Sequence, residues 1–300
     1  MEEFKSGFVS LVGRTNVGKS TLLNSLVKEK VAITANKVQT TRTAIKAILN
    51  DEKYQIIITD TPGIHKPKTK LGETMVNTAF TMFSEVDVIL FLIEATSEEI
   101  GRGDRRILDK IIESKKPCIL IINKIDLVRK DKLLNLIDTY SKEYNFEAVV
   151  PICATKQDGT ETIIEELVKI LPKGPKYYSD EEYTDQTVRQ ISEEIIREKA
   201  LKFLNEEVPH GIYIEIEKFK NRKTTKGQEI HDIDAIIYCL RESHKGIIIG
   251  KGGNLLKKIA TYARQDIEKM LDTKVNLKVW VKVKEDWQEK DNIVNKFKIK

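Results

Sequence analysis

Residues 13–20, Gly-Arg-Thr-Asn-Val-Gly-Lys-Ser, match the pattern GxxxxGK[ST], which forms a loop around nucleotide phosphates. The apolar stretch 8–12 precedes the pattern and the helix-compatible stretch 21–27 follows it, which is the context that such a loop requires. Its glycines let backbone N–H groups close on phosphate oxygens, while Lys19 reaches the outer phosphates and Ser20 supplies a Mg²⁺ ligand. The predicted phosphate-binding residues are Gly13, Asn16, Val17, Gly18, Lys19, Ser20 and Thr21.

The stretch Asp60-Thr-Pro-Gly63 follows a second apolar run, 54–59. An aspartate at the end of such a strand holds Mg²⁺ through water, and the N–H of Gly63 is placed to face the terminal phosphate. A DxxG pattern alone is common. Its order and spacing after Ser20 make it informative here.

Between these motifs lies the polar segment 38–43, in which a threonine could complete the Mg²⁺ shell when the γ-phosphate is present. We predict Thr41 rather than Thr40 for this role. Without the γ-phosphate, the same segment would be a solvated loop. The predicted catalytic residues are Lys19, Thr41, Asp60 and Gly63, and the predicted Mg²⁺ ligands are Ser20, Thr41 and Asp60.

Asn123-Lys124-Ile125-Asp126 comes at the end of the apolar run 119–122. The Asp126 carboxylate can accept hydrogen bonds from both N1–H and the exocyclic amine of guanine, which adenine cannot offer. Such bidentate pairs discriminate by a few kcal/mol, so the motif favours GTP over ATP. Cys153, Ala154 and Thr155 follow another strand and are placed so that the Ala154 N–H reaches guanine O6.

A second candidate site is the GxxG sequence Gly250–Gly253, which lies between apolar residues and a helix. Three of its four positions lack a side chain, so a nucleic-acid backbone could approach closely. A glycine-rich connector between helices is the alternative interpretation. The predicted RNA-binding residues are Ile249, Gly250, Lys251, Gly252, Gly253, Lys257 and Lys258.

The charge distribution supports the RNA interpretation. The formal net charge of +5 is small for 300 residues, but residues 211–300 carry 20 basic and 13 acidic side chains. The stretch 243–265 holds five basic residues and no acidic one, and it spans the GxxG sequence. Such a local excess attracts phosphates without reading sequence.

The elements that must position these residues differ between the two halves. In the first half, short apolar strands alternate with helix-compatible stretches, which predicts an α/β fold with a mostly parallel sheet and helices on both faces. In the second half, the pattern helix, strand, strand, GxxG, helix, strand predicts an α+β module. Breaker-rich residues separate them, so we predict a nucleotide-binding domain at 1–172, a linker at 173–183 and an RNA-binding domain with a C-terminal extension at 184–300.

Composition excludes several classes of protein. No apolar run approaches the roughly 18 residues of a membrane span, and the acidic N-terminus is not typical of a signal peptide. We therefore expect a cytoplasmic protein. The three cysteines have neither disulfide-framework nor zinc-site spacing and are expected to be reduced: Cys118, Cys153 and Cys239.

The five nucleotide motifs, in this order, resemble those of the translation-factor-related GTPases, and Gln39-Thr-Thr-Arg42 resembles the Era family in particular. The arrangement around Gly250–Gly253 resembles the type II KH domain that follows the GTPase domain in Era. The resemblance implies Mg²⁺-dependent GTP hydrolysis and binding of the 3′ region of 16S ribosomal RNA in 30S subunit assembly. It also implies a monomer, and it leaves open a peripheral association with the inner face of the cell membrane.

Two positions bear on the rate of hydrolysis. Ile64 stands where Ras-type GTPases carry the glutamine that orients the attacking water. The resemblance implies that Asn16 helps to bind a potassium ion that acts in place of an arginine finger, so we predict slow hydrolysis that is faster in KCl than in NaCl. His65 is expected to lie in a solvated loop rather than act as a base. The alternative is an RNA-binding KH chaperone that senses GTP and GDP with negligible turnover.

Three features of the second half are less specific. Trp280 and Trp287 could stack on bases, but tryptophan on a half-buried strand is more often a core residue, which is our expectation. The basic segment 220–227 either contacts RNA or is a solvated turn. The polar tail after Trp287 is expected to be a surface extension. A GTPase of ion transport or tRNA modification is disfavoured, because the chain lacks apolar spans and a C-terminal catalytic cysteine pattern.

Overall fold

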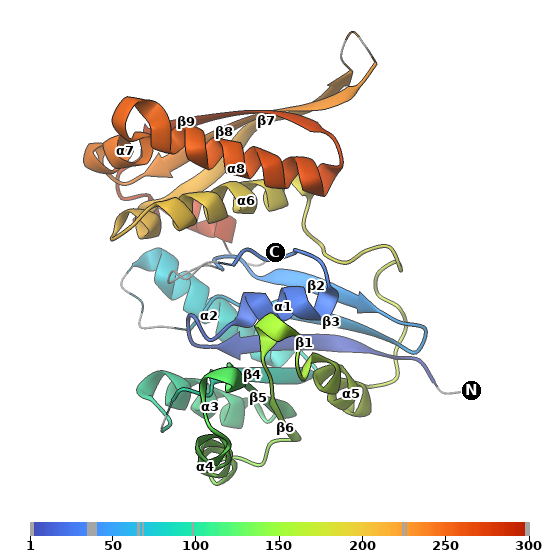
Figure 1. The fold of residues 1–300 in the computed structure, drawn as a ribbon. Coiled ribbons are helices and arrows are strands. Elements are labelled where there is room, and N and C mark those ends of the chain that lie inside the picture. Colours follow the sequence, from blue (N-terminus) through green and yellow to red (C-terminus); the bar gives the residue numbers. More distant parts are fainter. Residues whose placement is uncertain are drawn as a thin grey trace. The chain divides into compact units, whose positions relative to one another are not determined.

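The structure is a computed structural model that describes residues 3–34, 41–64, 67, 69–97, 99–223, 225 and 227–297. It forms two compact units (Figure 1). Residues 3–32 and 41–185 belong to the first unit, and Gln186–Val294 belong to the second. Each unit has its own hydrophobic clusters.

The first unit contains a six-stranded sheet in the order β2-β3-β1-β4-β5-β6. All neighbouring strands are parallel except β2, which pairs antiparallel with β3. The predicted mostly parallel α/β fold is therefore confirmed. Its elements are β1 (Lys5–Gly13), α1 (Lys19–Val27), β2 (Ile45–Asn50), β3 (Tyr54–Asp60), α2 (Lys70–Glu85), β4 (Val88–Glu94), α3 (Arg102–Ser114), β5 (Cys118–Asn123), α4 (Lys130–Ser141), β6 (Ala148–Pro151) and α5 (Thr160–Ile170).

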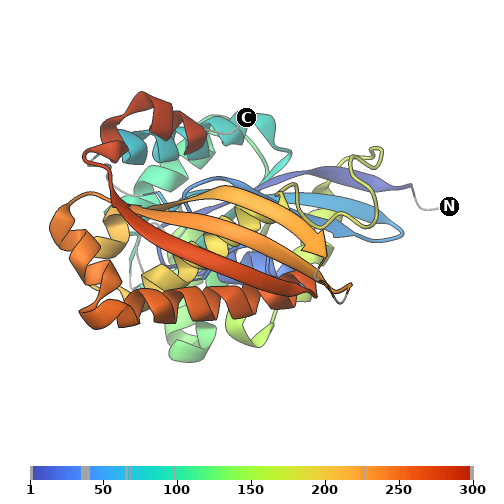
Figure 2. The ribbon, with the colours of Figure 1, turned by 90° about the horizontal axis from the view of Figure 1, so that it is seen from above.

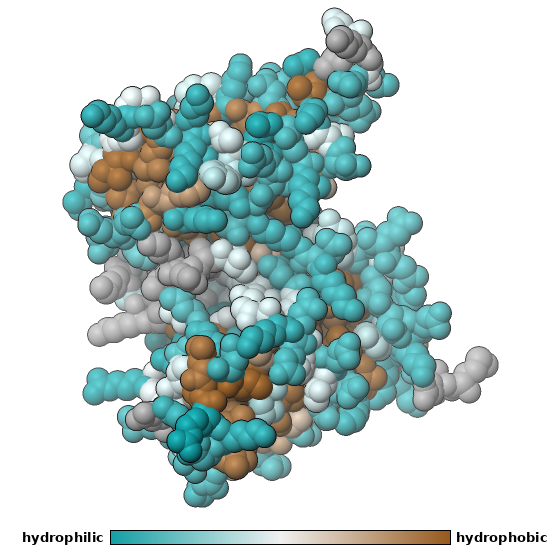
Figure 3. All heavy atoms as spheres, viewed as in Figure 1, coloured by the Kyte–Doolittle hydropathy of each residue, from teal (hydrophilic) through white to brown (hydrophobic). Residues whose placement is uncertain are grey.

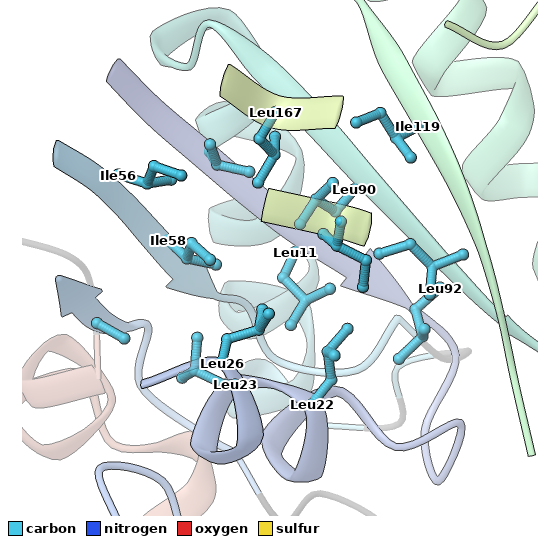
Figure 4. Packing of buried hydrophobic residues seen from close by; sticks show 14 of the residues in the cluster. Leu11, Leu22, Leu23, Leu26, Ile56, Ile58, Leu90, Leu92, Ile119 and Leu167 are labelled. Atoms are coloured by element: carbon cyan, nitrogen blue, oxygen red, sulfur yellow. The ribbon is translucent and has the colours of Figure 1, made fainter. Parts of the chain in front are cut away.

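Helices cover both faces of this sheet. On one face, Leu22 and Leu23 of α1 and Leu167 of α5 pack with alternate strand residues such as Leu11 and Leu90 (Figure 4). On the other face, residues of α2, α3 and α4 pack against the intervening strand positions, including Phe91 and Ile122. Because both faces are buried, the strands are continuously apolar, and their carboxyl ends are left for ligands.

The predicted linker at 173–183 lies against the first unit. Its residues run from the start of β1 to the edge strand β2, with backbone bridges from Lys173 to Lys5 and from Thr184 to Ala47. The buried Gln55 side chain hydrogen-bonds the backbone of Tyr177 and Tyr178. The compact unit consequently ends at Asp185 rather than near Pro172. We call residues 173–185 the strap.

The second unit contains a three-stranded sheet in the order β7-β8-β9, with β7 and β8 antiparallel and β8 and β9 parallel. Figure 2 shows the strands side by side, with α8 running along them. Apolar residues of α6, α7 and α8 bury one face of the sheet. The predicted order of helix, strand, strand, GxxG, helix and strand is present, with one further helix, α7, before the GxxG. The elements are α6 (Val188–Phe203), β7 (Tyr213–Lys223), β8 (Glu229–Cys239), α7 (Glu242–Ile249), α8 (Asn254–Leu271) and β9 (Lys274–Val283).

Three expectations for the second half meet different outcomes. Trp287 is fully buried and its Nε1 donates to the Gly211 carbonyl at 3.0 Å, as expected of a core residue. Trp280 is 44% exposed, so the core expectation is wrong for this residue. It lies on the face of β9 opposite the helices, because Val279 and Val281 pack toward them. The tail is not wholly a surface extension, since Ile293 and Val294 of the short helix α9 (Asp291–Val294) are buried.

The three cysteines have the reduced and buried state that we expected from the sequence. Cys118, Cys153 and Cys239 are free thiols and all are buried. Burial raises the pKa of Cys118 and of Cys239, which keeps these two thiols protonated. Within the described ranges, no helix is long and apolar enough to cross a membrane.

Candidate functional site

The phosphate-loop residues lie between β1 and α1, as predicted. Gly18 adopts φ 106° just before the first turn of α1. An added Cβ there would lie 2.3 Å from Asn123 Nδ2, so only glycine lets this loop pass so close to the end of β5. Asn16 also has positive φ and is exposed, while Val17 is buried beside it. The loop therefore presents its backbone N–H groups at a helix N-terminus, which is a favourable site for phosphate.

Lys19 lies beneath this loop. Its side chain is almost fully buried, and Nζ donates to the Gly13 and Arg14 carbonyls at 3.0 and 2.9 Å. Burial lowers the pKa of Lys19 to about 8, and the charge of Asp60 partly opposes that shift. A phosphate beside the ammonium group would favour its charged form further.

Three oxygen atoms from distant parts of the chain meet next to Lys19. Ser20 Oγ lies 2.9 Å from both Thr41 Oγ1 and Asp60 Oδ2, and Thr41 Oγ1 lies 3.0 Å from Asp60 Oδ2. Asp60 is completely buried, and its second oxygen, Oδ1, has no hydrogen-bond partner among the described residues. Burial raises the pKa of Asp60, and the charge of Lys19 opposes this. An unpaired buried carboxylate oxygen beside two hydroxyls is a donor set that suits Mg²⁺.

This oxygen cluster contains a single carboxylate. Among the residues that the structure describes, no group of three or more His, Cys, Asp or Glu side chains could hold a metal ion. Mg²⁺ typically takes one or two carboxylates and completes its shell with water and substrate phosphates. The cluster therefore fits a magnesium ion that is bound together with a nucleotide, not a separate all-protein metal site.

The segment after Asp60 lies against the phosphate loop. Ile64 N donates to the Gly13 carbonyl at 3.3 Å, and an added Cβ on Gly63 would lie 2.7 Å from Thr15 Cγ2. The Ile64 side chain is 3% exposed and packs in the core with Val12. It therefore offers no polar group to a water molecule. Thr40 and His65 lie outside the described residues.

Asn123, the last residue of β5, ties the base-recognition loop to the phosphate loop. Its Nδ2 donates to the Val17 carbonyl at 2.9 Å, and its Oδ1 accepts from the N–H groups of Lys124 and Ala154. We predicted that the Ala154 N–H would face guanine O6. In this structure the Ala154 N–H donates to Asn123 Oδ1 at 3.1 Å, which gives the buried Asn123 amide oxygen a partner. The contact with guanine O6 stays a prediction.

Asp126 is partly exposed at the end of the same loop, where a base could reach it. Hydrogen bonding from Cys153 is the main cause that lowers the pKa of Asp126, and Lys156 Nζ lies 3.3 Å from its Oδ2. The Cys153 sulfur lies 3.4 Å from Thr155 Oγ1. The structure thus brings the predicted base-contacting residues together, with Asp126 held as a carboxylate.

The predicted RNA-binding loop joins α7 to α8. Gly252 and Gly253 adopt φ 60° and 76°, and an added Cβ on either would meet nothing within 4 Å. Lys251 is exposed between them and Gly250. The loop is therefore open to a phosphate backbone on its outer side, as the GxxG pattern predicts.

The three isoleucines before the loop have separate environments. Ile248 is buried, Ile249 is half-buried and Ile247 is 50% exposed. Figure 3 shows apolar surface where Figure 1 places α7 and the adjoining end of α8. Ile247 is thus an exposed apolar residue beside the loop. It is not among the predicted RNA-binding residues, because the sequence did not show which of the three isoleucines lies in the core.

The two lysines of α8 also differ. Lys257 and Lys258 are both exposed, but the Lys258 ammonium lies 4.4 Å from the centre of the Phe203 ring on α6. Lys258 therefore already has a cation–π partner, which leaves Lys257 and Lys251 as the better placed of the predicted phosphate contacts.

Family models match both units of the chain. A model described as "50S ribosome-binding GTPase" matches residues 8–124, and a model described as "KH domain" matches residues 207–288. With the phosphate loop, oxygen cluster and base loop described above, these matches define a P-loop GTPase unit followed by a KH unit.

Whole-chain relatives narrow this class. The chain is 52% identical over 295 residues to GTPase Era of Clostridioides difficile (strain 630), with 98% of each covered. It is 51% identical over 291 residues to GTPase Era of Ruminiclostridium cellulolyticum, covering 97% of this chain and 96% of the relative. The chain belongs to the Era family of GTPases, which hydrolyse GTP.

Solved structures agree over nearly the whole chain. A crystal structure of Era in complex with MgGDPNP and nucleotides 1506–1542 of 16S ribosomal RNA is 39% identical, covers 98% of both chains and has a TM-score of 0.93. A variant of Aquifex aeolicus Era bound to GDP and AlF₄⁻ is also 39% identical, with a TM-score of 0.92.

Proposed function

We propose that this protein is a GTP-driven switch that hydrolyses Mg²⁺·GTP at the oxygen cluster and binds the 3′ region of 16S ribosomal RNA through its KH unit during 30S subunit assembly. The observation that carries the nucleotide half is the meeting of Ser20, Thr41 and Asp60 within 3.0 Å beside the buried Lys19. These residues come from three separate motifs, and they place two hydroxyls and one carboxylate where a nucleotide-bound Mg²⁺ would find oxygen ligands.

Each residue has a defined part in the reaction. Ser20, Thr41 and Asp60 would hold Mg²⁺, which neutralises charge that develops on the phosphate oxygens. Lys19 and the N–H groups before α1 bind the phosphates, and the N–H of Gly63 faces the terminal one. Asn123, Lys124 and Asp126 fix the base loop and select guanine. Because Ile64 is buried and apolar, no side chain at this position orients the water, so turnover is slow without a stimulating partner.

The RNA half of the proposal draws on the second unit. The open GxxG loop, the exposed Lys251 and Lys257, and the local excess of basic residues suit a phosphate backbone. The similar Era structure contains nucleotides 1506–1542 of 16S ribosomal RNA, which indicates the RNA segment to test. We place the protein in the cytoplasm, where small ribosomal subunits are assembled, and we propose that it is a monomer.

Single-turnover hydrolysis of GTP, with and without an RNA of that 16S segment, tests the proposal. We expect slow hydrolysis that requires Mg²⁺ and is lost in Lys19→Ala, together with salt-dependent binding of the RNA. Retained GTP affinity in Lys19→Ala would contradict the assignment of the phosphate loop. Equal affinity for the 16S segment and for an unrelated RNA of the same length would contradict the proposed RNA target.

A further inference from the structure

Arg14, the second residue of the phosphate loop, is held by a set of residues that the nucleotide motifs do not include. Its Nε donates to Asp104 Oδ1 at 3.0 Å, and its Nη2 donates to Ser97 Oγ at 3.2 Å. Asp104 is completely buried. The guanidinium group is thus hydrogen-bonded at and just before the start of α3, and it does not serve as an arginine finger in this structure.

The start of α3 is built to receive this arginine. Asp104 lies in the first turn of the helix, where the helix dipole favours a carboxylate. Gly103 leaves room for the arginine stem, because an added Cβ would lie 2.7 Å from Arg14 Cδ and 3.2 Å from Cγ. A buried carboxylate and a space filled by the arginine side chain are two separate features that fit the same partner.

Glu94 connects Arg14 to the base-recognition loop. It is the last residue of β4, and the sheet register pairs it with Asn123 at the end of β5. Its Oε2 accepts from Lys124 Nζ at 2.7 Å, while its Oε1 lies 3.9 Å from Arg14 Nη2. Lys124 Nζ also donates to the Asn16 carbonyl at 3.0 Å.

We propose that Glu94, Asp104 and Gly103 are positioning residues that hold Arg14 and Lys124, and so fix the phosphate loop and the base-recognition loop relative to each other. We call the four charged residues Arg14, Glu94, Asp104 and Lys124 the loop clamp. The clamp makes recognition of the guanine base depend on the position of the phosphate loop. This inference rests on the proposed nucleotide site and adds residues to it.

The competing interpretation is that these ion pairs only stabilise the fold. Half-exposed ion pairs are worth little on average, and a buried carboxylate needs a partner whatever its function. The clamp differs from an ordinary ion pair because it joins the ligand-binding loops that follow β1 and β5 through Glu94, at the end of the strand between them. A purely structural role would change the melting temperature and leave the preference between nucleotides unchanged.

The test uses Glu94→Gln and Gly103→Ala in the full chain, with Glu143→Gln as the matched control. Glu143 pairs with Arg105, the neighbour of Asp104, at 2.7 Å, and both side chains are about 40% exposed. Affinities for GTP, GDP and inosine triphosphate are measured for each protein, along with the melting temperature. Inosine triphosphate lacks the exocyclic amine that Asp126 would bind.

For Glu94→Gln we expect about a tenfold loss of affinity for GTP and GDP alike, the effect of one charge-assisted hydrogen bond, and a smaller preference for GTP over inosine triphosphate. Gly103→Ala should show the same two changes together with a lower melting temperature, because the added Cβ displaces Arg14 from the buried Asp104 carboxylate, and this outweighs the better helix propensity of alanine. Glu143→Gln should change neither affinity nor preference.

An unchanged GTP affinity in both variants would overturn the inference. So would a weaker affinity with an unchanged preference between GTP and inosine triphosphate, since a structural role accounts for that result. Failure of the unsubstituted protein to bind GTP would contradict the proposed nucleotide site itself, so the two failures are distinguishable.

Discussion

Asp60 and Lys19 are buried beside each other, and burial disfavours the charged form of both. It raises the pKa of Asp60 and lowers the pKa of Lys19 to about 8, while the two opposite charges partly offset these shifts. A phosphate next to Lys19 and a cation next to Asp60 would each favour the charged form of its neighbour. Binding of nucleotide and binding of Mg²⁺ should therefore strengthen each other.

Potassium dependence can be tested at Asn16, an exposed residue at the edge of the phosphate loop whose backbone carbonyl accepts from Lys124. We expect GTP hydrolysis to be faster in KCl than in NaCl by about an order of magnitude or more, because a cation that replaces an arginine finger acts on the charge of the transition state. Asn16→Ala should reduce the KCl rate to the NaCl rate, as measured by single-turnover kinetics.

Asn135→Ala is the control for this experiment, since Asn135 is an exposed asparagine on α4. This variant should retain the full difference in hydrolysis rate between KCl and NaCl. Equal rates in KCl and NaCl for the unsubstituted protein would exclude the potassium site at Asn16.

At the residue scale, the sequence predicts side chains that belong to a spaced motif better than side chains that support them. Ser20, Thr41 and Asp60 come together as their motifs predict. Arg14 and Glu94 belong to no pattern that specifies their partners. Their contact depends on the register of β1 with β4, and the contact of Glu94 with Lys124 depends on the register of β4 with β5. The hydrogen bond from Ala154 to Asn123 likewise depends on the conformation of two loops.

The strap shows what determines an element that lacks regular secondary structure. Gln55 is completely buried, and its amide makes four hydrogen bonds at 2.6–3.0 Å: to Asn50 Oδ1, to the Tyr178 carbonyl, and from the N–H groups of Tyr177 and Tyr178. The Tyr177 ring lies 5.0 Å from the Phe8 ring. A single buried amide thus provides partners for three backbone groups of this segment.

Replacing Gln55 by leucine should release the strap. The variant removes the three hydrogen bonds that the Gln55 amide makes to partly buried backbone groups of Tyr177 and Tyr178, which we expect to cost about 3 kcal/mol of unfolding free energy at about 1 kcal/mol for each bond. Chemical denaturation measures this cost, and trypsin should cleave after Lys173 or Lys176 more readily than in the unsubstituted protein.

Gln265→Leu provides the comparison, because Gln265 is exposed on α8. Its free energy of unfolding should lie within about 0.5 kcal/mol of that of the unsubstituted protein. A similar small effect for Gln55→Leu, with unchanged cleavage, would show that the strap does not depend on this amide.

Elements with strong periodicity are predicted well from the sequence, and irregular ones are not. The apolar strands follow their predicted ranges closely, and helix α8 begins directly after the GxxG sequence, where a helix was predicted. Proline and glycine in the strap indicate that helix and strand end there, but they carry no information about what the segment packs against. Trp280 was assigned to the core for a similar reason, since alternation along β9 does not identify which face the helices cover.

At the scale of the whole molecule, the two units have separate hydrophobic clusters and separate candidate sites. The nucleotide residues lie at the ends of strands in the first unit, and the GxxG loop lies between two helices of the second. Substitutions that change surface charge in one unit, without disturbing its core, should therefore leave ligand binding by the other unit intact in the absence of coupling.

Gly252→Asp tests this separation. Aspartate tolerates the positive φ of residue 252 better than most residues, and an added Cβ there meets nothing within 4 Å, so the fold should be retained. The new carboxylate lies beside Lys251 and would repel an RNA phosphate. We expect RNA affinity to fall at least tenfold, with a weaker dependence on salt, and GTP affinity to stay unchanged.

Two further variants make the result specific. Gly252→Ala adds a Cβ without charge, so it should lose less RNA affinity than the aspartate if charge is the cause. Gly227→Asp adds the same charge at another open glycine of positive φ, the last residue of the basic segment 220–227. If it weakens RNA binding, that segment contacts RNA; if it does not, the segment is a solvated turn.

RNA affinity that survives Gly252→Asp would remove the GxxG loop from the RNA site. A joint loss of GTP and RNA binding in this variant would mean that the units are not independent.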